Sequence, residues 1–121
     1  MKVLIVDDEP LARKRLTRLL QEQESFEVVA EAENGEQAIA ACNVHQPDVV
    51  LMDIVMPGLN GFQATRQLTK APETASIPVI IVTTKDQETD RVWGMRQGAK
   101  AYLTKPIEEK VLVDAIAQAM G

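Results

Sequence analysis

A run of four apolar residues, Val49-Val50-Leu51-Met52, ends directly at the carboxylate of Asp53. Such a run, with two β-branched residues and no polar alternation, is typical of a strand buried on both faces of a parallel sheet. A charge at the end of a buried strand is costly unless another group uses or neutralises it. Because open α/β sheets bind ligands at the carboxyl ends of their strands, Asp53 is a candidate site residue. Taken alone, it fits a loop cap about equally well.

Other predicted strands also end in polar residues. Asp7 and Asp8 follow the strand Val3–Val6, Thr83 and Thr84 follow Val79–Val82, and Lys105 follows Ala99–Thr104. A further strand, Phe26–Ala32, is less apolar, which favours a position near the edge of the sheet.

Segments with the spacing of amphipathic helices alternate with these strands. They are Pro10–Gln23, a helix that begins after Asn34, a helix from Asn60 through Leu68, Asp86–Gln97 and Glu108–Met120. Asn34 and Asn60 suit N-cap positions, and Gly98 suits the position after a helix end. Strict alternation of strand and helix predicts one α/β domain over residues 1–121, with a doubly wound, five-stranded parallel sheet.

Composition limits the function classes. A formal net charge of −5 argues against a nucleic-acid surface and is compatible with a bound metal cation. The single Cys42 forms no internal disulfide, and the longest apolar runs have the length of a strand. With no signal peptide or membrane span in the sequence, we expect a cytoplasmic protein that does not bind membranes.

If the strands are neighbours, the carboxylates of Asp7, Asp8 and Asp53 converge at one edge of the sheet. Two such charges repel by roughly 4 kcal/mol at close range and an effective dielectric constant of about 20. A divalent cation makes such a cluster tolerable, and oxygen-only ligands suit Mg²⁺ or Mn²⁺ rather than zinc. Without metal, we expect Asp7→Asn to raise the free energy of unfolding by about 1–3 kcal/mol.

The residues beside these carboxylates suit phosphate chemistry. The hydroxyl of Thr83 and the ammonium of Lys105 are suitable groups for holding a phosphoryl oxygen. An aspartate that attacks phosphorus forms an acyl phosphate.

The receiver domain of two-component response regulators, a CheY-like domain, is resembled by this chain in four motifs: Asp7-Asp8 after the first predicted strand, Asp53 after the third, Thr83 after the fourth and Lys105-Pro106 after the fifth. The resemblance covers the whole chain and implies the flavodoxin-like strand order 2-1-3-4-5. It implies that Asp53 accepts the phosphoryl group, and that Asp7, Asp8, Asp53 and the backbone carbonyl of Val55 hold Mg²⁺.

The resemblance also assigns the remaining site residues. Thr83 and Lys105 would contact the phosphoryl group, so that Asp53, Thr83 and Lys105 form the reacting set. Tyr102 would be the switch aromatic that turns inward when Thr83 moves. The Lys105–Pro106 peptide would be cis, which is affordable only before proline.

The same resemblance implies the partners. A histidine kinase or histidine phosphotransfer protein would dock beside the first helix, and an output protein would read the face between about Asp86 and Met120. The chain would be a monomer or weak dimer. It would be a signalling domain that promotes its own phosphorylation and dephosphorylation, and not an enzyme.

Two other functions compete with this one. A Mg²⁺-dependent phosphatase of the haloacid dehalogenase class also forms an aspartyl phosphate, but it needs Asp-x-Asp after its first strand, where this chain has Asp7-Asp8-Glu9. A phosphorylation-independent scaffold is expected to lack one of the five site positions, and all five are present.

The two halves of the chain resemble different branches of the receiver family. The segment from Asp7 to Arg13 resembles receivers of LytTR-type regulators, whereas the sequence from about Pro47 onward resembles stand-alone regulators of type IV pilus twitching motility. This pattern favours a recombined (chimeric) or designed receiver.

Several conspicuous side chains have simpler interpretations. His45 is expected on the surface near a helix end, and four methionines are expected to pack in the interior: Met52, Met56, Met95 and Met120. Trp93 fits either the core or a partner surface.

Overall fold

The computed structural model describes residues 1–121 and contains strands and helices in strict alternation. In chain order they are β1 (Lys2–Val6), α1 (Pro10–Gln21), β2 (Glu27–Ala32), α2 (Gly35–His45), β3 (Val49–Met52), α3 (Gly61–Lys70), β4 (Val79–Thr83), α4 (Glu88–Arg96), β5 (Ala101–Thr104) and α5 (Glu109–Met120). Every predicted strand and helix is present, and only the ends differ, as is usual for boundaries predicted from sequence.

The five strands form one parallel sheet in the order β2-β1-β3-β4-β5. This order confirms the doubly wound, flavodoxin-like α/β fold. It also confirms the edge position of β2, whose residues are exposed or only partly buried except for Ala32. The strand order reverses between β1 and β3, which is the place where ligands bind in such sheets.

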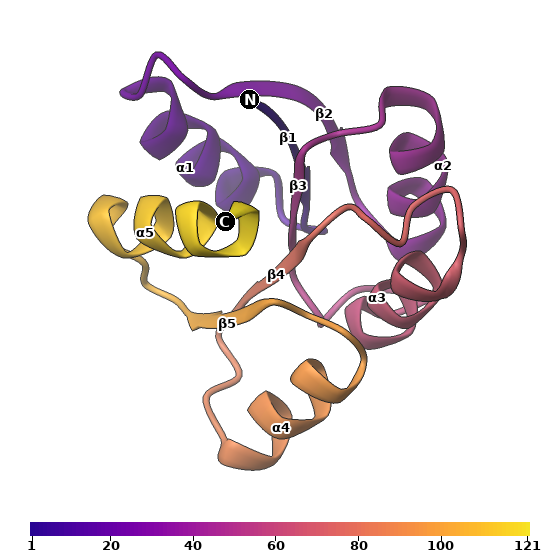
Figure 1. The fold of residues 1–121 in the computed structure, drawn as a ribbon. Helices are drawn as coiled ribbons and strands as arrows, with labels where there is room; N and C mark the ends of the chain where they lie inside the picture. Colours follow the sequence, from indigo (N-terminus) through magenta and orange to yellow (C-terminus); the bar gives the residue numbers. More distant parts are fainter.

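Helices cover both faces of the sheet (Figure 1). α1 and α5 lie on one side, α2 and α3 lie on the other, and α4 packs near β5. The side chains of β3 alternate between the two faces, as the pleat of a strand requires. Val49 and Leu51 join the cluster under α1 and α5, whereas Val50 and Met52 join the cluster under α2 and α3. The uninterrupted apolar run is therefore explained by helices on both faces.

Local signals in the sequence fix the starts of α2 and α3. The side chain of Asn34 accepts a hydrogen bond from the backbone N–H of Gln37 at 2.8 Å. At α3, Asn60 accepts from the N–H of Gln63 at 2.9 Å, and the Gln63 side chain accepts from the N–H of Asn60 at 3.0 Å. This reciprocal pair is a capping box, and it supports the helix that follows Asp53 in the chain.

The outer face of α4 remains exposed. Trp93 is 49% exposed, so its side chain is part of the surface and not of the core. Met52 and Met56 are buried as predicted, but the packing prediction is wrong for Met95 and Met120, which are 44% and 42% exposed, because they lie on helix surfaces that no other element covers. Gly94 faces inward instead, where an added Cβ would approach Ile81 to 2.7 Å.

His45 is the exposed last residue of α2, as predicted. None of the helices combines the length and the apolar character needed to cross a membrane.

Candidate functional site

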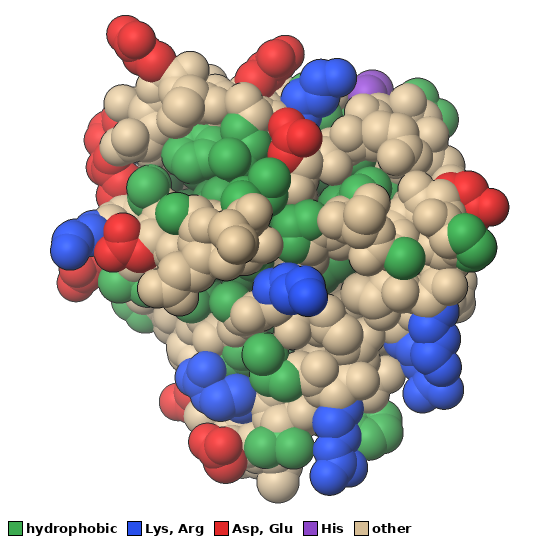
Figure 2. Space-filling model, viewed as in Figure 1, with side chains coloured by type: hydrophobic (Ala, Val, Ile, Leu, Met, Phe, Trp, Pro, Cys, Tyr) green, Lys and Arg blue, Asp and Glu red, His purple; other side chains and the backbone are tan.

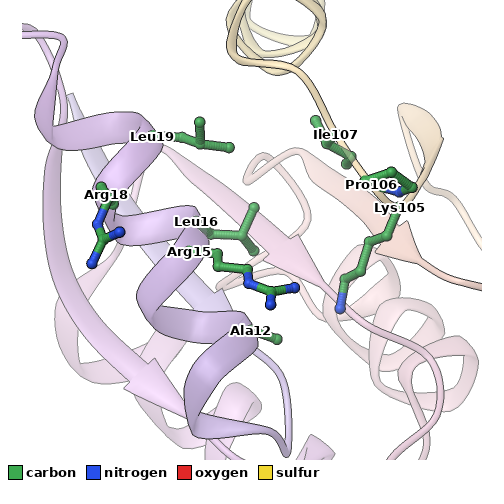
Figure 3. Close-up of a pocket in the computed structure, with 8 residues that line it drawn as sticks. All are labelled: Ala12, Arg15, Leu16, Arg18, Leu19, Lys105, Pro106 and Ile107. Atoms are coloured by element: carbon green, nitrogen blue, oxygen red, sulfur yellow. The ribbon is translucent and has the colours of Figure 1, made fainter.

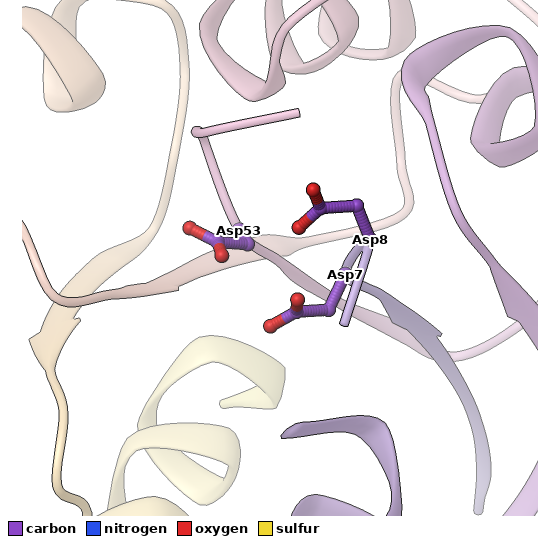
Figure 4. Close-up of side chains that lie close together, drawn as sticks. All are labelled: Asp7, Asp8 and Asp53. Carbon is purple, nitrogen blue, oxygen red and sulfur yellow. The ribbon is translucent and has the colours of Figure 1, made fainter. Parts of the chain in front are cut away.

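The carboxylates of Asp7, Asp8 and Asp53 meet at the carboxyl edge of the sheet (Figure 4). One oxygen from each lies within 4.8 Å of the other two. The register explains this meeting: β1 and β3 pair up to Val6 and Met52, so the next residues, Asp7 and Asp53, leave the sheet side by side. Asp7 is buried and Asp8 is exposed.

Lys105 reaches this cluster from the end of β5. Its ammonium donates a hydrogen bond to Asp7 Oδ2 at 2.6 Å and lies 3.6 Å from Asp53 Oδ2. Burial lowers the pKa of Lys105, but the hydrogen bond to Asp7 and the charges of Asp53 and Asp7 outweigh burial, so the pKa lies above its usual value. Lys105 is therefore a fixed cation, and the peptide bond that joins it to Pro106 is cis.

The side chain of Asp53 is held by the backbone that follows it. Its Oδ1 accepts a hydrogen bond from the N–H of Ile54 at 2.7 Å. Burial is the largest effect on the Asp53 carboxyl and, with the nearby charge of Asp7, raises its pKa. Lys105, the Thr83 hydroxyl and the Ile54 N–H act in the opposite direction but do not cancel the rise. Asp53 is thus a poorly solvated carboxylate beside one cation.

Gly61, the first residue of α3, lets the chain close tightly behind Asp53. Its N–H donates to the carbonyl of Ile54 at 3.2 Å. A Cβ at this position would lie 2.1 Å from the carbonyl oxygen of Asp53, a distance that no side chain can occupy. We expect Gly61→Ala to displace the Asp53 loop and to destabilise the fold by about 1–3 kcal/mol, the usual range for overpacking. Urea unfolding measures the change. Gly121→Ala, at the open chain end, is the control, and equal stability of the two variants would contradict this role.

Thr83 and Tyr102 lie behind the carboxylates. Thr83 is fully buried at the end of β4, and its hydroxyl accepts a hydrogen bond from the N–H of Lys85 at 3.3 Å. Tyr102 is 4% exposed, and its phenol donates a hydrogen bond to the Lys85 carbonyl at 2.8 Å. Burial raises the pKa of Tyr102, with the charge of Asp90 adding to the effect, so the phenol keeps its donor proton.

Arg91, which the sequence did not single out, holds Tyr102 in place. Its guanidinium carbon lies 5.2 Å from the centre of the Tyr102 ring, within the range of a cation–π interaction. Its Nη1 also donates a hydrogen bond to the Tyr102 carbonyl at 3.0 Å. An Arg in a helix is usually a solvated side chain, so only the packing of α4 on β5 reveals this contact.

A cavity of about 450 Å³ opens over the carboxylates. Of the predicted residues, Asp8, Asp53, Val55 and Lys105 line it. Three further polar residues also lie on its wall, namely Glu9, Arg15 and Thr84. They reach the cavity because α1 and the chain after β4 lie on either side of it, which is a tertiary feature.

The donor set fits a hard divalent cation. Three carboxylates offer oxygen atoms from one side, whereas a single ammonium, that of Lys105, neutralises them in part. Mg²⁺ prefers carboxylate oxygens and retains several water molecules, which suits an open cavity with one exposed ligand. No His or Cys belongs to the cluster, so its ligand set suits Mg²⁺ or Mn²⁺ better than zinc.

Because Asp7 is paired with Lys105, we expect the charge of Asp53, and not that of Asp7, to destabilise the metal-free protein most. Asp7→Asn would remove the closest partner of Lys105 along with the repulsion, so a smaller stabilisation is expected there. The charged form of Asp53 is the less favourable one, because the side chain is buried beside Asp7 and lies farther from Lys105 than Asp7 does. Asp53→Asn removes this charge and keeps an oxygen for the Ile54 N–H. We expect this change to raise the free energy of unfolding by about 1–3 kcal/mol in the presence of EDTA.

The pH dependence tests the cause of that gain. The folded pKa of Asp53 lies above the unfolded one, so the wild type loses stability as pH rises through the folded value. The gain from Asp53→Asn is therefore complete above the folded pKa and disappears below the unfolded pKa, where both carboxyls are neutral. Urea unfolding of both proteins at several pH values measures it, and a pH-independent difference would contradict the electrostatic explanation.

Known proteins are similar to this chain in sequence. The model of the response regulator receiver domain matches residues 3–117. Protein PilH of Pseudomonas aeruginosa is 62% identical over 115 residues, covering 95% of this chain and 93% of PilH. Other curated relatives are longer, and the chain spans about half of their length.

Two solved structures show the same fold. The response regulator domain of Thermotoga maritima CheB superposes with a TM-score of 0.90 and 33% identity, covering 99% of this chain and 96% of that chain. A chain of the CheX–CheY complex with BeF₃ and Mg²⁺ from Borrelia burgdorferi has a TM-score of 0.92 and 25% identity, covering 100% of this chain and 90% of that chain.

Proposed function

The chain belongs to the family of response regulator receiver domains, which are signalling domains, and on this premise we propose that it is a phosphorylation-dependent switch. In this proposal residues 1–121 form a single receiver domain that accepts a phosphoryl group on Asp53. The observation that carries the proposal is the placement of a poorly solvated Asp53 carboxylate beside Lys105, at the strand-order reversal of the sheet.

The arrangement suits nucleophilic attack by Asp53. A carboxylate oxygen forms a bond to phosphorus while the bond from phosphorus to the leaving group breaks. The Ile54 N–H holds Oδ1, which orients the side chain, and the Lys105 ammonium is near enough to Oδ2 to pair with an incoming phosphoryl oxygen. Mg²⁺, bound by Asp7, Asp8, Asp53 and the Val55 carbonyl, would neutralise the charge of the transferred group.

Thr83 and Tyr102 would carry the signal. The Thr83 hydroxyl would move to contact the phosphoryl group. The backbone of Lys85 connects this hydroxyl to Tyr102, because its N–H donates to Thr83 and its carbonyl accepts from the Tyr102 phenol. Because Arg91 and the Lys85 carbonyl hold Tyr102 in a buried position, a shift of Thr83 would alter the surface of α4. The population of the active state then depends on whether the phosphoryl group binds it more tightly than the inactive state.

The proposed partners follow from the same resemblance. A histidine kinase or phosphotransfer protein would supply the phosphoryl group beside α1, and an output protein would bind the face of α4, β5 and α5. Apolar side chains of α4 are exposed on that face, namely Val92, Trp93 and Met95, and apolar atoms lie over α4 at the lower end of Figure 2.

The division into two branches remains a separate hypothesis. If α1 came from a LytTR-type receiver, it would select donors of that branch while the output face stayed that of a motility regulator. Phosphotransfer rates from donors of both branches test the division, and a clear preference for the motility-type donor would refute it.

Labelling of the wild type tests the proposed function. Acetyl phosphate with Mg²⁺ is expected to add one phosphoryl group per chain, and EDTA is expected to prevent the addition; intact mass measures both. A chain that takes up no phosphoryl group would favour the scaffold alternative. Steady release of phosphate from phosphate monoesters such as p-nitrophenyl phosphate would instead favour the phosphatase alternative.

A further inference from the structure

A second cavity adjoins the acidic one, between α1 and the segment that follows β5 (Figure 3). Its volume is about 280 Å³, just below the usual size range of pockets for drug-sized ligands. Apolar side chains, including Leu16, Leu19 and Ile107, form much of its wall. The charged side chains on the wall are all cationic, and they include Arg15 and Lys105. This composition suits a small anion with an apolar body.

Arg15 belongs to the walls of both cavities, as does Lys105. Figure 3 shows the Arg15 guanidinium directed toward the side chain of Lys105 across the opening between them. The neighbouring cation on α1, Arg13, is paired with Glu31 at 2.9 Å, and Lys105 is paired with Asp7. Arg15 makes no hydrogen bond or ion pair in the structure, so its donors are free to bind a ligand.

We propose that this second cavity binds the carboxylate that leaves a small acyl phosphate donor, with Arg15 as the group that receives its charge. The inference rests on the proposed function, because it concerns the donor side of the same reaction. A bond forms between an Asp53 oxygen and phosphorus, and the bond between phosphorus and the acyl oxygen breaks. The electron pair stays on that oxygen, so a carboxylate leaves and no proton is needed.

Arg15 stands where this charge appears. The phosphoryl group must lie between Asp53 and Lys105 in the acidic cavity, so the leaving group is directed out of it. Arg15 lies on the shared wall, and the apolar side chains beyond it can cover a short acyl chain. A guanidinium binds a carboxylate through two parallel hydrogen bonds, which makes Arg better suited than Lys to this position.

Donors with different leaving groups separate this role from a general effect of charge. Acetyl phosphate releases acetate, an anion, whereas phosphoramidate releases ammonia, which is neutral. With Mg²⁺ present, we expect Arg15→Ala to lower the second-order rate constant for acetyl phosphate by about tenfold, the effect of losing one charge-assisted hydrogen-bonded pair in a partly exposed site. The rate constant for phosphoramidate is expected to stay within about twofold, which also shows that the variant is folded.

Two further variants complete the experiment. Lys14→Ala removes an equal charge from the exposed face of α1, outside both cavities, and is expected to leave both rate constants unchanged. Arg15→Lys keeps the charge without the planar fork and is expected to restore part of the loss. Equal losses with both donors, or no loss with acetyl phosphate, would overturn the inference while leaving the proposed function intact. Failure of the wild type to react with either donor would contradict the proposed function and the inference together.

Discussion

Asp53→Asn is expected to abolish the uptake of a phosphoryl group from small-molecule donors. The amide is a far weaker nucleophile than the carboxylate and cannot form an acyl phosphate. The substitution preserves size and retains an oxygen for the hydrogen bond from Ile54, so the loss would not reflect a collapsed site. Intact mass after incubation with acetyl phosphate and Mg²⁺ measures the uptake.

A matched control separates this effect from the loss of any nearby charge. Asp86 is an exposed aspartate in the connection between β4 and α4, outside the cavity over Asp53. Asp86→Asn is expected to be labelled like the wild type. Labelling of Asp53→Asn at the wild-type level would contradict the assignment of Asp53.

Asp8→Asn is expected to weaken Mg²⁺ binding by about 100-fold, equal to about 2.7 kcal/mol. Loss of even an indirect partner of a metal typically lowers affinity 10–100-fold, so loss of a direct anionic ligand is expected at the upper end. Asp8 is the exposed member of the three carboxylates and has no cation of its own, whereas Asp7 and Asp53 lie near Lys105. Its main electrostatic partner would therefore be the metal.

The Mg²⁺ concentration that gives half-maximal labelling measures this change. At saturating Mg²⁺, most of the labelling rate is expected to return, because the nucleophile Asp53 is untouched. Asp86→Asn again serves as the control. An unchanged Mg²⁺ dependence of Asp8→Asn would show that Asp8 is not a ligand.

The fold could be predicted from the sequence because its signals are local. Continuous apolar runs such as Val49–Met52 indicate strands buried on both faces, and Asn34 and Asn60 mark helix starts through their side-chain hydrogen bonds. The cluster of Asp7, Asp8 and Asp53 could be predicted too, because neighbouring parallel strands end at one edge of the sheet.

Contacts that depend on how helices pack could not be predicted in this way. Arg91 reaches Tyr102 only because Gly94 lets α4 approach the sheet closely, and Arg15 reaches the cavities only through the placement of α1. Amphipathic spacing also failed to show that Met95 lies on an uncovered face, since a helix pattern does not reveal which faces other elements cover.

The most direct test of the account is to locate the phosphoryl group chemically. Borohydride reduces an acyl phosphate of aspartate to homoserine, which marks the residue permanently. After reaction of the wild type with acetyl phosphate and Mg²⁺, peptide mass analysis is expected to find homoserine at position 53 and aspartate at positions 7 and 8. Homoserine at position 7 or 8, or a phosphoryl group on any other residue in place of Asp53, would contradict the account.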